Sequence, residues 1–382
     1  MRKILILNGR YVPGYKDGGP VRTMINLVNV FGNEAEINIL CLDRDYGDTE
    51  PYPGIKINEY NRVGLANVYY ATEETYNADL IEKLSKGMDL IYCCGPFGFF
   101  TRACVRLNKL HKLDCPVMIA SMGTFSPNAL AIKALKKKAF FALMKLLSMY
   151  KDITWSVTSE REDSELKAVI GKDAVTYIAE DIPRTDILSH DKIKRQGHID
   201  VIFLSRIARK KNLIEAARIL KLLPEDVSCD FDVYGIQEDM DYFRECEKVL
   251  LTLPENVNYN YRGEVNPEKV LETLSGYDVF LFPKLGENYG HVIAEAMAAG
   301  TVPVISDETP WLDLSEYNAG YALPLNNPDG FKDVLVRLAG EDESAFRLRV
   351  QSCKDYIEKH NRESIKNSGY RQIFGINGNE ND

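Results

Sequence analysis

The sequence predicts an α/β protein with two Rossmann-like domains of similar size. Short β-rich runs alternate with longer helical patterns along the chain, as they do when parallel strands are connected by helices. With 382 residues, the chain is too long for a single hydrophobic core to be the first expectation. A polar stretch without an apolar period, residues 189–200, separates the strand-like runs into two series.

The first series predicts a domain over residues 1–188, with strands at KILIL, INILCL, DLIYCC, PVMIAS and ITWSVTS. After the linker at 189–200, the second series predicts a domain over residues 201–365, with strands at DVIFLS, CDFDVYG, VNYNYRG, DVFLFP and TVPVIS. Residues 366–382 are expected to form the end of a C-terminal helix and a polar tail.

The bulk composition is that of an ordinary globular protein, with 45% hydrophobic and 27% charged residues. The net charge of −9 disfavours nucleic acid as a partner, because nucleic-acid binders usually carry a basic excess. No run approaches the roughly 18 apolar residues that span a bilayer, and MRKILILNGRYVPG is interpreted as a buried strand and not as a signal peptide. We therefore expect a cytoplasmic protein. The eight cysteines lack metal-ligand spacing and are predicted to be buried apolar side chains, so no metal site is expected.

The loop after the first strand contains Gly18 and Gly19, and Pro20 follows at the expected start of a helix. Glycines let backbone amides approach a ligand, and a helix N-terminus favours phosphate. The spacing is neither G-x-G-x-x-G nor a P-loop, so the loop taken alone favours a plain turn. Because neither predicted domain has G-x-G-x-x-G after its first strand, a dehydrogenase is disfavoured.

Four cations directly follow the first strand of the second domain: Arg206, Arg209, Lys210 and Lys211. They are expected at the carboxyl edge of the sheet, where open α/β sheets bind ligands, and there they could neutralise a diphosphate. The alternative is a solvated charge run, although four cations at a helix N-terminus oppose the helix dipole.

Two carboxylates frame the segment GENYGHVIAEAMAAG. Glu287 is expected in a loop after the apolar strand DVFLFP, and Glu295 on the second turn of the helix that follows. Carboxylates can accept hydrogen bonds from sugar hydroxyls, and loop amides at a helix start can hold phosphates. The alternative for Glu295 is an exposed helical acid. The loop amides concerned are those of Asn288, Tyr289 and Gly290.

These motifs resemble retaining glycosyltransferases of family four, which have the GT-B fold of two Rossmann-like domains. The resemblance rests on the E-x7-E pattern of Glu287 and Glu295 and on Arg206 and Lys211 after a preceding strand. GGPVRTMINLV is similar to the family's N-terminal glycine loop, and VTSERED to its TSE segment. GENYGHVIAEAMAAGTVPVISDETPW is similar to a subgroup found in bacterial surface-polysaccharide assembly.

The resemblance implies that Arg206 and Lys211 bind the diphosphate of a nucleotide sugar. It also implies that Glu287 contacts the transferred sugar and Glu295 the ribose. Transfer would retain the anomeric configuration by front-face attack, and would need no metal or other cofactor, since Arg206 and Lys211 supply the countercharge. A UDP-sugar is favoured as the donor, with a GDP-sugar as the alternative. The donor site would be completed by Gly18, Gly19, Asn288, Tyr289 and Gly290.

The expected acceptor is a glycan, lipid-linked at the cytoplasmic face of the membrane. Most family members place a catalytic-site His or Arg around ASMGTFSPNAL, but no His stands there, so no catalytic side chain is named on the acceptor side. That departure keeps two alternatives open. One is a sugar-nucleotide epimerase of the same fold, and the other is a non-catalytic binder of glycans or nucleotides.

A basic amphipathic helix is predicted from Ser126 to Lys151. Residues 133–151 contain six lysines and no acid, which suits an anionic membrane surface. Phe140, Phe141 and Met144 lie outside the main apolar stripe and are expected to reach the lipid interface. The alternative is a helix packed onto the first domain by that stripe, which consists of Ile132, Leu135, Ala139, Ala142, Leu143, Leu146, Leu147 and Tyr150.

Overall fold

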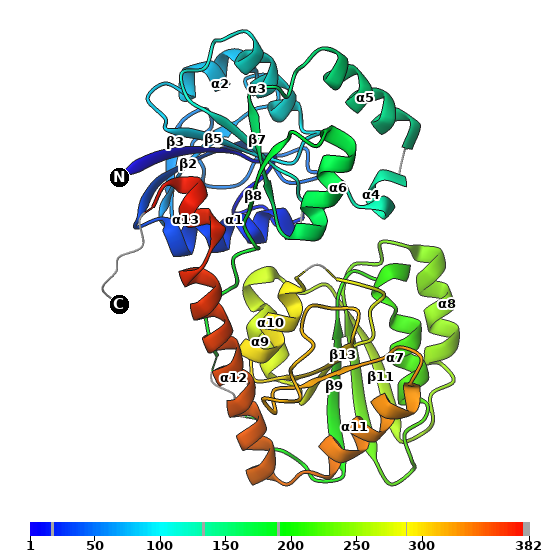
Figure 1. The fold of residues 1–382 in the computed structure, drawn as a ribbon. Coiled ribbons are helices and arrows are strands. Elements are labelled where there is room, and N and C mark those ends of the chain that lie inside the picture. The colour runs from blue at the N-terminus through cyan, green and yellow to red at the C-terminus, as the bar shows by residue number, and fades with distance from the viewer. Residues whose placement is uncertain (17–18, 132–133, 189–191, 288, 377–382) are drawn as a thin grey trace. The chain divides into compact units, whose positions relative to one another are not determined.

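Two compact units make up the fold. Unit 1 consists of Met1–Pro183 and Ser364–Asp382, and unit 2 consists of Arg184–Glu363. The structure is a computed structural model, drawn in Figure 1, that describes residues 1–16, 19–131, 134–188, 192–287 and 289–376.

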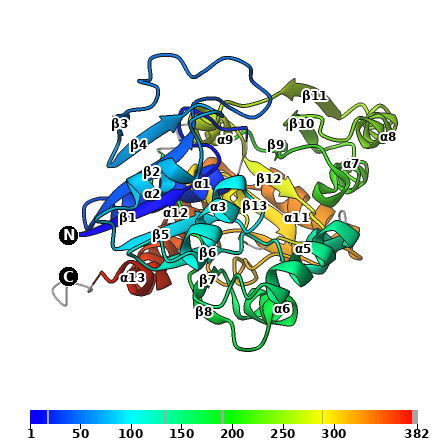
Figure 2. The same cartoon turned by 90° about the horizontal axis from the view of Figure 1, so that it is seen from above.

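Unit 1 is built on a sheet that has eight strands within the described residues, in the order β3-β4-β2-β1-β5-β6-β7-β8 (Figure 2). Neighbouring strands run parallel, except that β3 pairs with β4 in the antiparallel direction. The strands are β1 (Arg2–Leu7), β2 (Ala35–Leu42), β3 (Tyr60–Val63), β4 (Ala66–Ala71), β5 (Leu90–Cys94), β6 (Val117–Ala120), β7 (Ile153–Val157) and β8 (Val175–Ile178).

Helices cover both faces of this sheet. Successive residues of a strand point to opposite faces, and apolar side chains on both faces of β1 pack against helices. Ile4 and Ile6 of β1 enter a core cluster with side chains of α1 and α13. Leu5 and Leu7 enter a second cluster with side chains of α2, α3, α5 and α6. The helices of unit 1 are α1 (Gly19–Phe31), α2 (Ala78–Leu84), α3 (Phe99–Lys109), α4 (Pro127–Ala131), α5 (Ala134–Leu146), α6 (Glu160–Ile170) and α13 (Gly369–Phe374).

The sheet of unit 2 is parallel throughout, and within the described residues it has six strands in the order β11-β10-β9-β12-β13-β14. The chain moves outward from β9 to β11 and then returns to the other side of β9 with β12. Ligands of open α/β sheets bind beyond the carboxyl ends of the strands at such a reversal. The strands are β9 (His198–Leu204), β10 (Ser228–Tyr234), β11 (Val257–Gly263), β12 (Val279–Phe282), β13 (Val302–Ser306) and β14 (Tyr321–Leu323).

The helices of unit 2 surround a single large core cluster that includes strand side chains such as Phe203 and Phe282. The last long helix, α12, contains the boundary between the units, and the chain returns through it to unit 1. The helical elements are η1 (Arg209–Lys211), α7 (Leu213–Leu220), α8 (Met240–Leu250), η2 (Pro267–Lys269), α9 (Val270–Ser275), α10 (His291–Ala298), α11 (Pro328–Gly340) and α12 (Glu343–Lys366).

The predicted α/β architecture with two Rossmann-like sheets is confirmed, and all the predicted strands are present. Four further strands, β3, β4, β8 and β14, were not predicted. Three of them lie at sheet edges, where β3 reads YNRV and β8 reads VTYI with mostly exposed or half-buried side chains. An edge strand buries few side chains, so its sequence lacks the continuous apolar run of the inner strands.

The unit boundaries differ from the predicted domain ranges in two places. Strand β9 begins at His198, inside the predicted linker, because His198, Ile199 and Asp200 already pair with β10. The C-terminal segment belongs to unit 1, because α13 buries Tyr370 and Phe374 in its core. Residues 189–191 of the predicted linker and 377–382 of the predicted tail lie outside the described residues.

Candidate active site

The loops after β9 and β12 meet at the point where the strand order of unit 2 reverses. Asn212, with a φ of 61°, donates from Nδ2 to the carbonyl oxygen of Pro283 at 2.7 Å. The amide of Leu285 donates to the carbonyl oxygen of Lys210 at 3.2 Å. These two hydrogen bonds fix the basic loop after β9 to the acidic loop after β12, as expected for a site at the carboxyl ends of these strands.

Glu287 lies in the second loop, between two lysines. Its Oε2 is 3.3 Å from Nζ of Lys211, which comes from η1. The same oxygen accepts a hydrogen bond from Nζ of Lys284, which follows β12. The side chains of Lys211 and Glu287 are 19% and 20% exposed, whereas that of Lys284 is 2% exposed. A ligand can therefore reach the carboxylate and Lys211, while Lys284 supports the carboxylate from the protein interior.

Lys284 was not among the predicted site residues. Burial lowers the pKa of its ammonium group to about 7, and the nearby charge of Lys211 also lowers it, while Glu287 acts in the opposite direction. The Ser306 hydroxyl donates to the carbonyl oxygen of Lys284 at 2.6 Å and fixes its backbone. A lysine directly after the apolar strand DVFLFP, three residues before Glu287, was the sequence signal that could have found it.

The helix α10 begins directly after Gly290, which has a φ of 81°. A Cβ at this position would lie 2.8 Å from Cδ1 of Ile293 and 3.1 Å from Cγ of Glu287. Glycine is required here both by the backbone conformation and by the close approach of Glu287. The N-terminus of α10, with amides that have no partner within the helix, therefore lies next to Glu287.

Tyr289 is held in this loop by aromatic neighbours. Its ring centroid lies 5.4 Å from that of Trp311 and 4.9 Å from that of His291. Its carbonyl oxygen also accepts a hydrogen bond of 2.6 Å from Nε1 of Trp311. These contacts fix Tyr289 two residues before the start of α10. Asn288, which was predicted together with Tyr289 and Gly290, lies outside the described residues.

Glu295 is buried, at 6% exposure, on the second turn of α10. The alternative of an exposed helical acid is therefore wrong. Nη1 of Arg184 lies 3.8 Å from Oε1 of Glu295, and Arg184 is itself held by Asp186 at 3.1 Å. The carbonyl oxygen of Arg184 accepts a hydrogen bond of 2.7 Å from Asn361 of α12. Arg184 precedes the first strand of unit 2 by many residues, and no local pattern in the sequence pointed to it.

The other predicted site residues do not contact Lys211 or Glu287 in the hydrogen bonds and ion pairs described below. Arg206 is exposed and pairs with Glu238 in the loop after β10. Arg209 forms two hydrogen bonds with Glu245 of α8, at 2.8 and 2.6 Å. Gly19 is the first residue of α1 in unit 1, and a Cβ there would have open space around it, whereas Gly18 lies outside the described residues.

Gly235 brings the loop after β10 against the loop after β9. Its φ is 141°, and a Cβ would lie only 1.8 Å from the carbonyl oxygen of Ser205. No other residue type fits at this distance. The backbone next to Arg206 is thus packed directly against the backbone of Gly235.

Comparison with known proteins assigns the family. Residues 186–355 match the family described as glycosyl transferases group 1. This part of the chain is a glycosyl transferases group 1 domain. The resemblance noted in the sequence is thereby confirmed, and so is the prediction of a glycosyltransferase at the level of the family.

Relatives and solved structures resemble the chain over most of its length. An uncharacterised glycosyltransferase of Methanocaldococcus jannaschii is 21% identical over 381 residues, with 95% of each chain covered. An uncharacterised 41.2 kDa protein in the cps region of Klebsiella pneumoniae is 22% identical over 375 residues, with 93% of this chain and 96% of that protein covered. The solved structure of Anabaena HepE in complex with UDP and glucose aligns over 95% of this chain and 100% of that chain, with a TM-score of 0.55 and 13% identity. Together with the two sheets, which are parallel apart from the β3–β4 pair, this likeness confirms the predicted GT-B fold.

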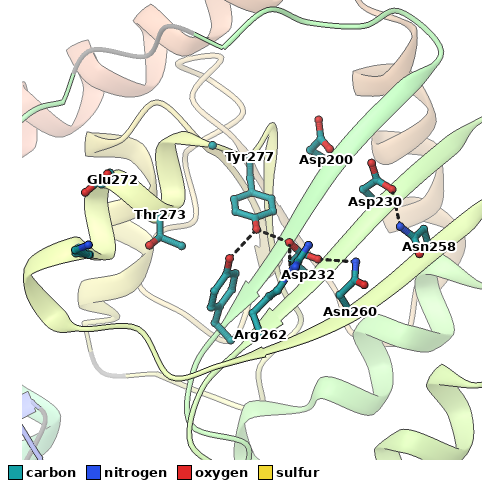
Figure 3. A pocket seen from close by; sticks show the side chains of 12 residues that line it. Asp200, Asp230, Asp232, Asn258, Asn260, Arg262, Glu272, Thr273 and Tyr277 are labelled. Atoms are coloured by element: carbon teal, nitrogen blue, oxygen red, sulfur yellow. Dashed lines mark hydrogen bonds and ion pairs between the residues drawn. The ribbon is translucent and has the colours of Figure 1, made fainter.

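A cavity of about 500 Å³ lies on the sheet of unit 2, and its lining includes neither Lys211 nor Glu287. Figure 3 shows its aspartates and asparagines on the strands, and Glu272 and Thr273 on the helix opposite. The lining residues are Asp200, Asp230, Asp232, Tyr234, Asn258, Asn260, Arg262, Lys269, Glu272, Thr273, Gly276 and Tyr277.

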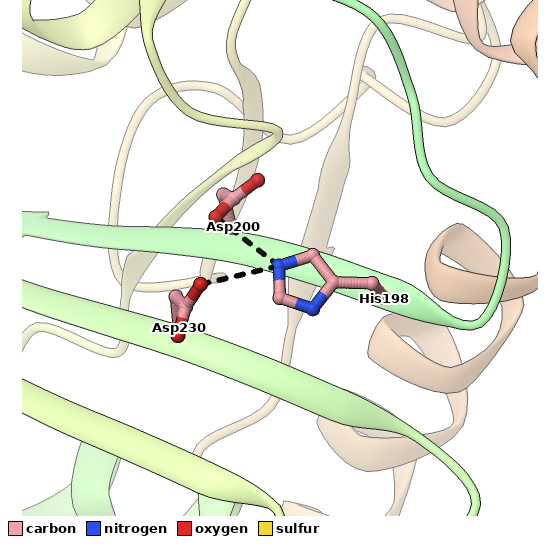
Figure 4. Close-up of side chains that lie close together, drawn as sticks. All are labelled: His198, Asp200 and Asp230. Carbon is pink, nitrogen blue, oxygen red and sulfur yellow. Dashed lines mark hydrogen bonds and ion pairs between the residues drawn. The ribbon is translucent and has the colours of Figure 1, made fainter.

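Among the residues that the structure describes, one group has the ligand types and spacing for a metal ion: His198, Asp200 and Asp230, with ligand atoms within 4.8 Å of one another (Figure 4). Two cations already neutralise it. Lys192 Nζ lies 2.5 Å from Asp200, and Arg195 lies 3.3 Å from Asp200 and 3.7 Å from Asp230. The group is therefore a balanced ion-pair cluster that ties the chain before β9 to the sheet.

The basic segment of unit 1 faces the core with a different side from the one that was predicted. Within the described residues it forms α4 and α5, and α5 ends at Leu146. The amide of Ala129 donates a hydrogen bond of 3.3 Å to the hydroxyl oxygen of Ser126, directly before α4. Phe141 and Met144, which were expected at the lipid interface, are buried in unit 1, and Phe140 packs against the same core. The prediction for these three side chains is wrong, because Phe97 and Phe125 provide rings 5.2 and 5.4 Å from that of Phe141.

The opposite side of α5 carries the apolar stripe. Leu135, Leu143, Leu146 and Leu147 are between 52% and 85% exposed, and Lys136, Lys138 and Lys145 beside them are also exposed. The alternative that the stripe packs onto unit 1 is therefore wrong for these leucines. Ile132 and Lys133 lie outside the described residues. None of the helices in the described part of the chain combines the length and the hydropathy needed to cross a bilayer.

Proposed function

We propose that this glycosyltransferase transfers a sugar from a nucleotide diphosphate sugar to a glycan acceptor. The observation that carries the proposal is the 3.3 Å contact between Lys211 and Glu287, where the loops after β9 and β12 meet. Both side chains are accessible to a ligand, and each binds a different kind of chemical group. An ammonium group attracts phosphate oxygens, whereas a carboxylate accepts hydrogen bonds from sugar hydroxyls. One donor molecule satisfies both.

The roles of the site residues follow the family resemblance. Lys211 and Arg206 bind the diphosphate, Glu287 contacts the transferred sugar, and Glu295 contacts the ribose. Arg206 has to leave Glu238 to do so, which costs little because an exposed ion pair contributes about 0–1 kcal/mol. The amides at the start of α10, together with those of Tyr289 and Gly290, bind phosphate oxygens in this proposal, which the position of Gly290 next to Glu287 supports. Countercharge at the departing diphosphate comes from Arg and Lys, so the proposal includes no metal or other cofactor.

The proposed reaction retains the anomeric configuration. The acceptor hydroxyl attacks the anomeric carbon on the face from which the diphosphate departs, and its proton passes to the leaving phosphate oxygen. The bond from the anomeric carbon to the phosphate oxygen breaks as the new glycosidic bond forms. Glu287 orients the sugar in this scheme, and Lys284 keeps its carboxylate in position when Lys211 binds the diphosphate.

The proposed acceptor is a lipid-linked glycan at a membrane surface, in the synthesis of a surface polysaccharide. The exposed leucines and lysines of α5 support membrane contact: leucines can enter the interface, and each lysine near anionic lipid contributes about 1 kcal/mol. The relative in the cps region of Klebsiella pneumoniae supports the polysaccharide part. A UDP-sugar is the proposed donor, which the likeness to a structure in complex with UDP and glucose supports.

The test is nucleotide release from UDP-glucose, UDP-galactose, UDP-N-acetylglucosamine and GDP-mannose by the wild type, Lys211→Ala and Lys210→Ala. Lys210 is an exposed neighbour in the same basic run and serves as the matched control. We expect release by the wild type and Lys210→Ala only, with water as the acceptor, and NMR should show the released sugar first in the anomeric configuration of the donor, before it mutarotates. An isomerised nucleotide sugar would indicate an epimerase, and binding without release a non-catalytic binder; either result contradicts the proposal.

A further inference from the structure

We propose that the cavity on the sheet of unit 2 is a carbohydrate-binding site, separate from the candidate active site. Its floor consists of side chains that point to one face of two neighbouring strands. On β10 these are Asp230, Asp232 and Tyr234, and on β11 they are Asn258, Asn260 and Arg262. Because the side chains of a strand alternate between its faces, these six form a continuous polar surface over two strands.

Asp232 holds the polar groups of this surface in place. Its two oxygens accept hydrogen bonds from Asn260 Nδ2 at 3.0 Å, Arg262 Nε at 2.9 Å and the Tyr277 hydroxyl at 2.6 Å. The Tyr277 hydroxyl also lies 3.0 Å from the Tyr234 hydroxyl. Asp232 is 7% exposed, so it orients the other groups and leaves them to face the cavity. Groups that are fixed before a ligand arrives lose little entropy when it binds.

The fixed groups match the chemistry of sugar hydroxyls. A hydroxyl both donates and accepts, and so it fits best where donors and acceptors are interleaved. The hydrogen bonds that Asn258 and Asn260 donate to Asp230 and Asp232, at 3.1 and 3.0 Å, each use one of the two amide N–H groups. Further donors and acceptors come from the second N–H and the oxygen of each asparagine amide. The guanidinium of Arg262 adds donors, and the Thr273 hydroxyl can both donate and accept. The rings of Tyr234 and Tyr277, nearly perpendicular at 81°, offer apolar surface for the sugar ring.

The charges of the cavity favour a neutral ligand. An anion would meet the carboxylates of Asp230 and Asp232, and desolvating it there is costly. A cation would find those carboxylates already engaged, Asp232 by Arg262 at 2.9 Å and Asp230 by Arg195 at 3.7 Å. The volume of about 500 Å³ lies within the roughly 300 to 1,000 Å³ typical of small-molecule sites.

Gly276 offers a way to block the cavity without straining the backbone. It follows α9 with a φ of −77°, is exposed, and lines the cavity. A Cβ there would meet only the carbonyl oxygen of Thr273, at 3.4 Å, which is close to ordinary contact. Gly276→Phe should therefore fill the cavity, and Gly276→Ala is its matched control.

The experiment measures binding of maltotriose, cellotriose and triacetylchitotriose to the full chain by saturation-transfer NMR and titration. We expect at least one of them to bind to the wild type and to Gly276→Ala with equal affinity. Asn258→Ala should weaken that binding by about tenfold or more, as the loss of one or two hydrogen bonds does. Gly276→Phe should weaken it at least as much, because the ring fills the cavity.

Three results would overturn the inference. The first is that none of the three sugars binds at about 10 mM, ten times the ~1 mM dissociation constant of a weak site. The second is sugar binding that Gly276→Phe leaves unchanged. The third is binding of spermidine in place of the sugars. Nucleotide release by Gly276→Phe is followed in parallel, so that failure of the cavity and failure of the proposed function are seen separately.

Discussion

Lys211 and Lys284 contact the same oxygen of Glu287, although one follows β9 and the other follows β12. The carboxylate thus joins the two loops at the reversal of the strand order. Lys211 is accessible to a ligand and Lys284 is buried, so the two lysines have different parts in this cluster. One can exchange its carboxylate partner for a phosphate, and the other keeps Glu287 in position.

Glu287→Gln is expected to lower the rate of transfer by about 100-fold or more, because the carboxylate is lost where the sugar is oriented. Nucleotide binding should remain, since Lys211 is unchanged. Steady-state rates and nucleotide titrations measure the two effects. Glu308→Gln is the control, because Glu308 is exposed and its carbonyl oxygen accepts the hydrogen bond from the Glu287 amide. Equal rates for Glu287→Gln and Glu308→Gln would contradict the role of Glu287.

Lys284 should make the stability of the fold depend on pH. Its pKa is about 7 in the folded state against an ordinary value of 10.5. Between these values the unfolded chain binds a proton that the folded chain does not, so the free energy of unfolding should rise with pH from about 7 upward. Lys284→Met should remove this rise, whereas Lys138→Met, an exposed lysine of α5, should keep it.

Urea unfolding of the three proteins at several pH values between about 6 and about 9 measures this dependence. A wild-type slope that survives in Lys284→Met would show that another group causes it.

Gly235→Ala is expected to destabilise unit 2 by more than about 2 kcal/mol, because the methyl group would collide with the carbonyl oxygen of Ser205 in addition to the strain of a positive φ. Gly263→Ala is the control, since Gly263 also has a positive φ, of 76°, but open space around its Cβ. Its cost should be about 1 kcal/mol. Chemical denaturation compares the two variants, and similar losses would mean that the contact with Ser205 is unimportant.

The exposed face of α5 should bind anionic membranes. The double variant Leu146→Gln/Leu147→Gln should reduce co-sedimentation with vesicles of phosphatidylcholine and phosphatidylglycerol, while stability changes by less than about 0.5 kcal/mol because both side chains are exposed. Vesicles of phosphatidylcholine alone should bind less wild-type protein, since they lack the negative charge. Equal sedimentation of wild type and variant would exclude these leucines from membrane contact.

The fold, and the strands and loops that carry the site residues, could be predicted from the sequence because both depend on local patterns. Continuous apolar runs such as DVFLFP define inner strands, and a glycine next to an amphipathic run defines a loop and a helix start. Glu287 and Lys211 were therefore each predicted at the carboxyl end of a strand. The structure shows that these strands are neighbours and that the two side chains lie 3.3 Å apart.

Features that depend on distant residues escaped prediction. Lys284 is buried, its carbonyl oxygen accepts a hydrogen bond from Ser306, and its ammonium group contacts Glu287. The contact with Ser306 is not implied by the residues next to Lys284. The orientation of α5 is set by Phe97 and Phe125, which belong to other parts of unit 1. Both sides of α5 are apolar enough to be buried, so the helix alone could not indicate which side faces the core.

The central claim is that Lys211 and Glu287 form a nucleotide-sugar site, and thermal unfolding with UDP, GDP, ADP and CMP tests it most directly. A nucleotide at about 100 times its dissociation constant should stabilise the folded wild type by roughly 2.7 kcal/mol. The account predicts that UDP raises the midpoint of the wild type and of Lys210→Ala, but not of Lys211→Ala. If no nucleoside diphosphate raises the wild-type midpoint, or if Lys211→Ala responds as the wild type does, the Lys211–Glu287 cluster is not a nucleotide-sugar site.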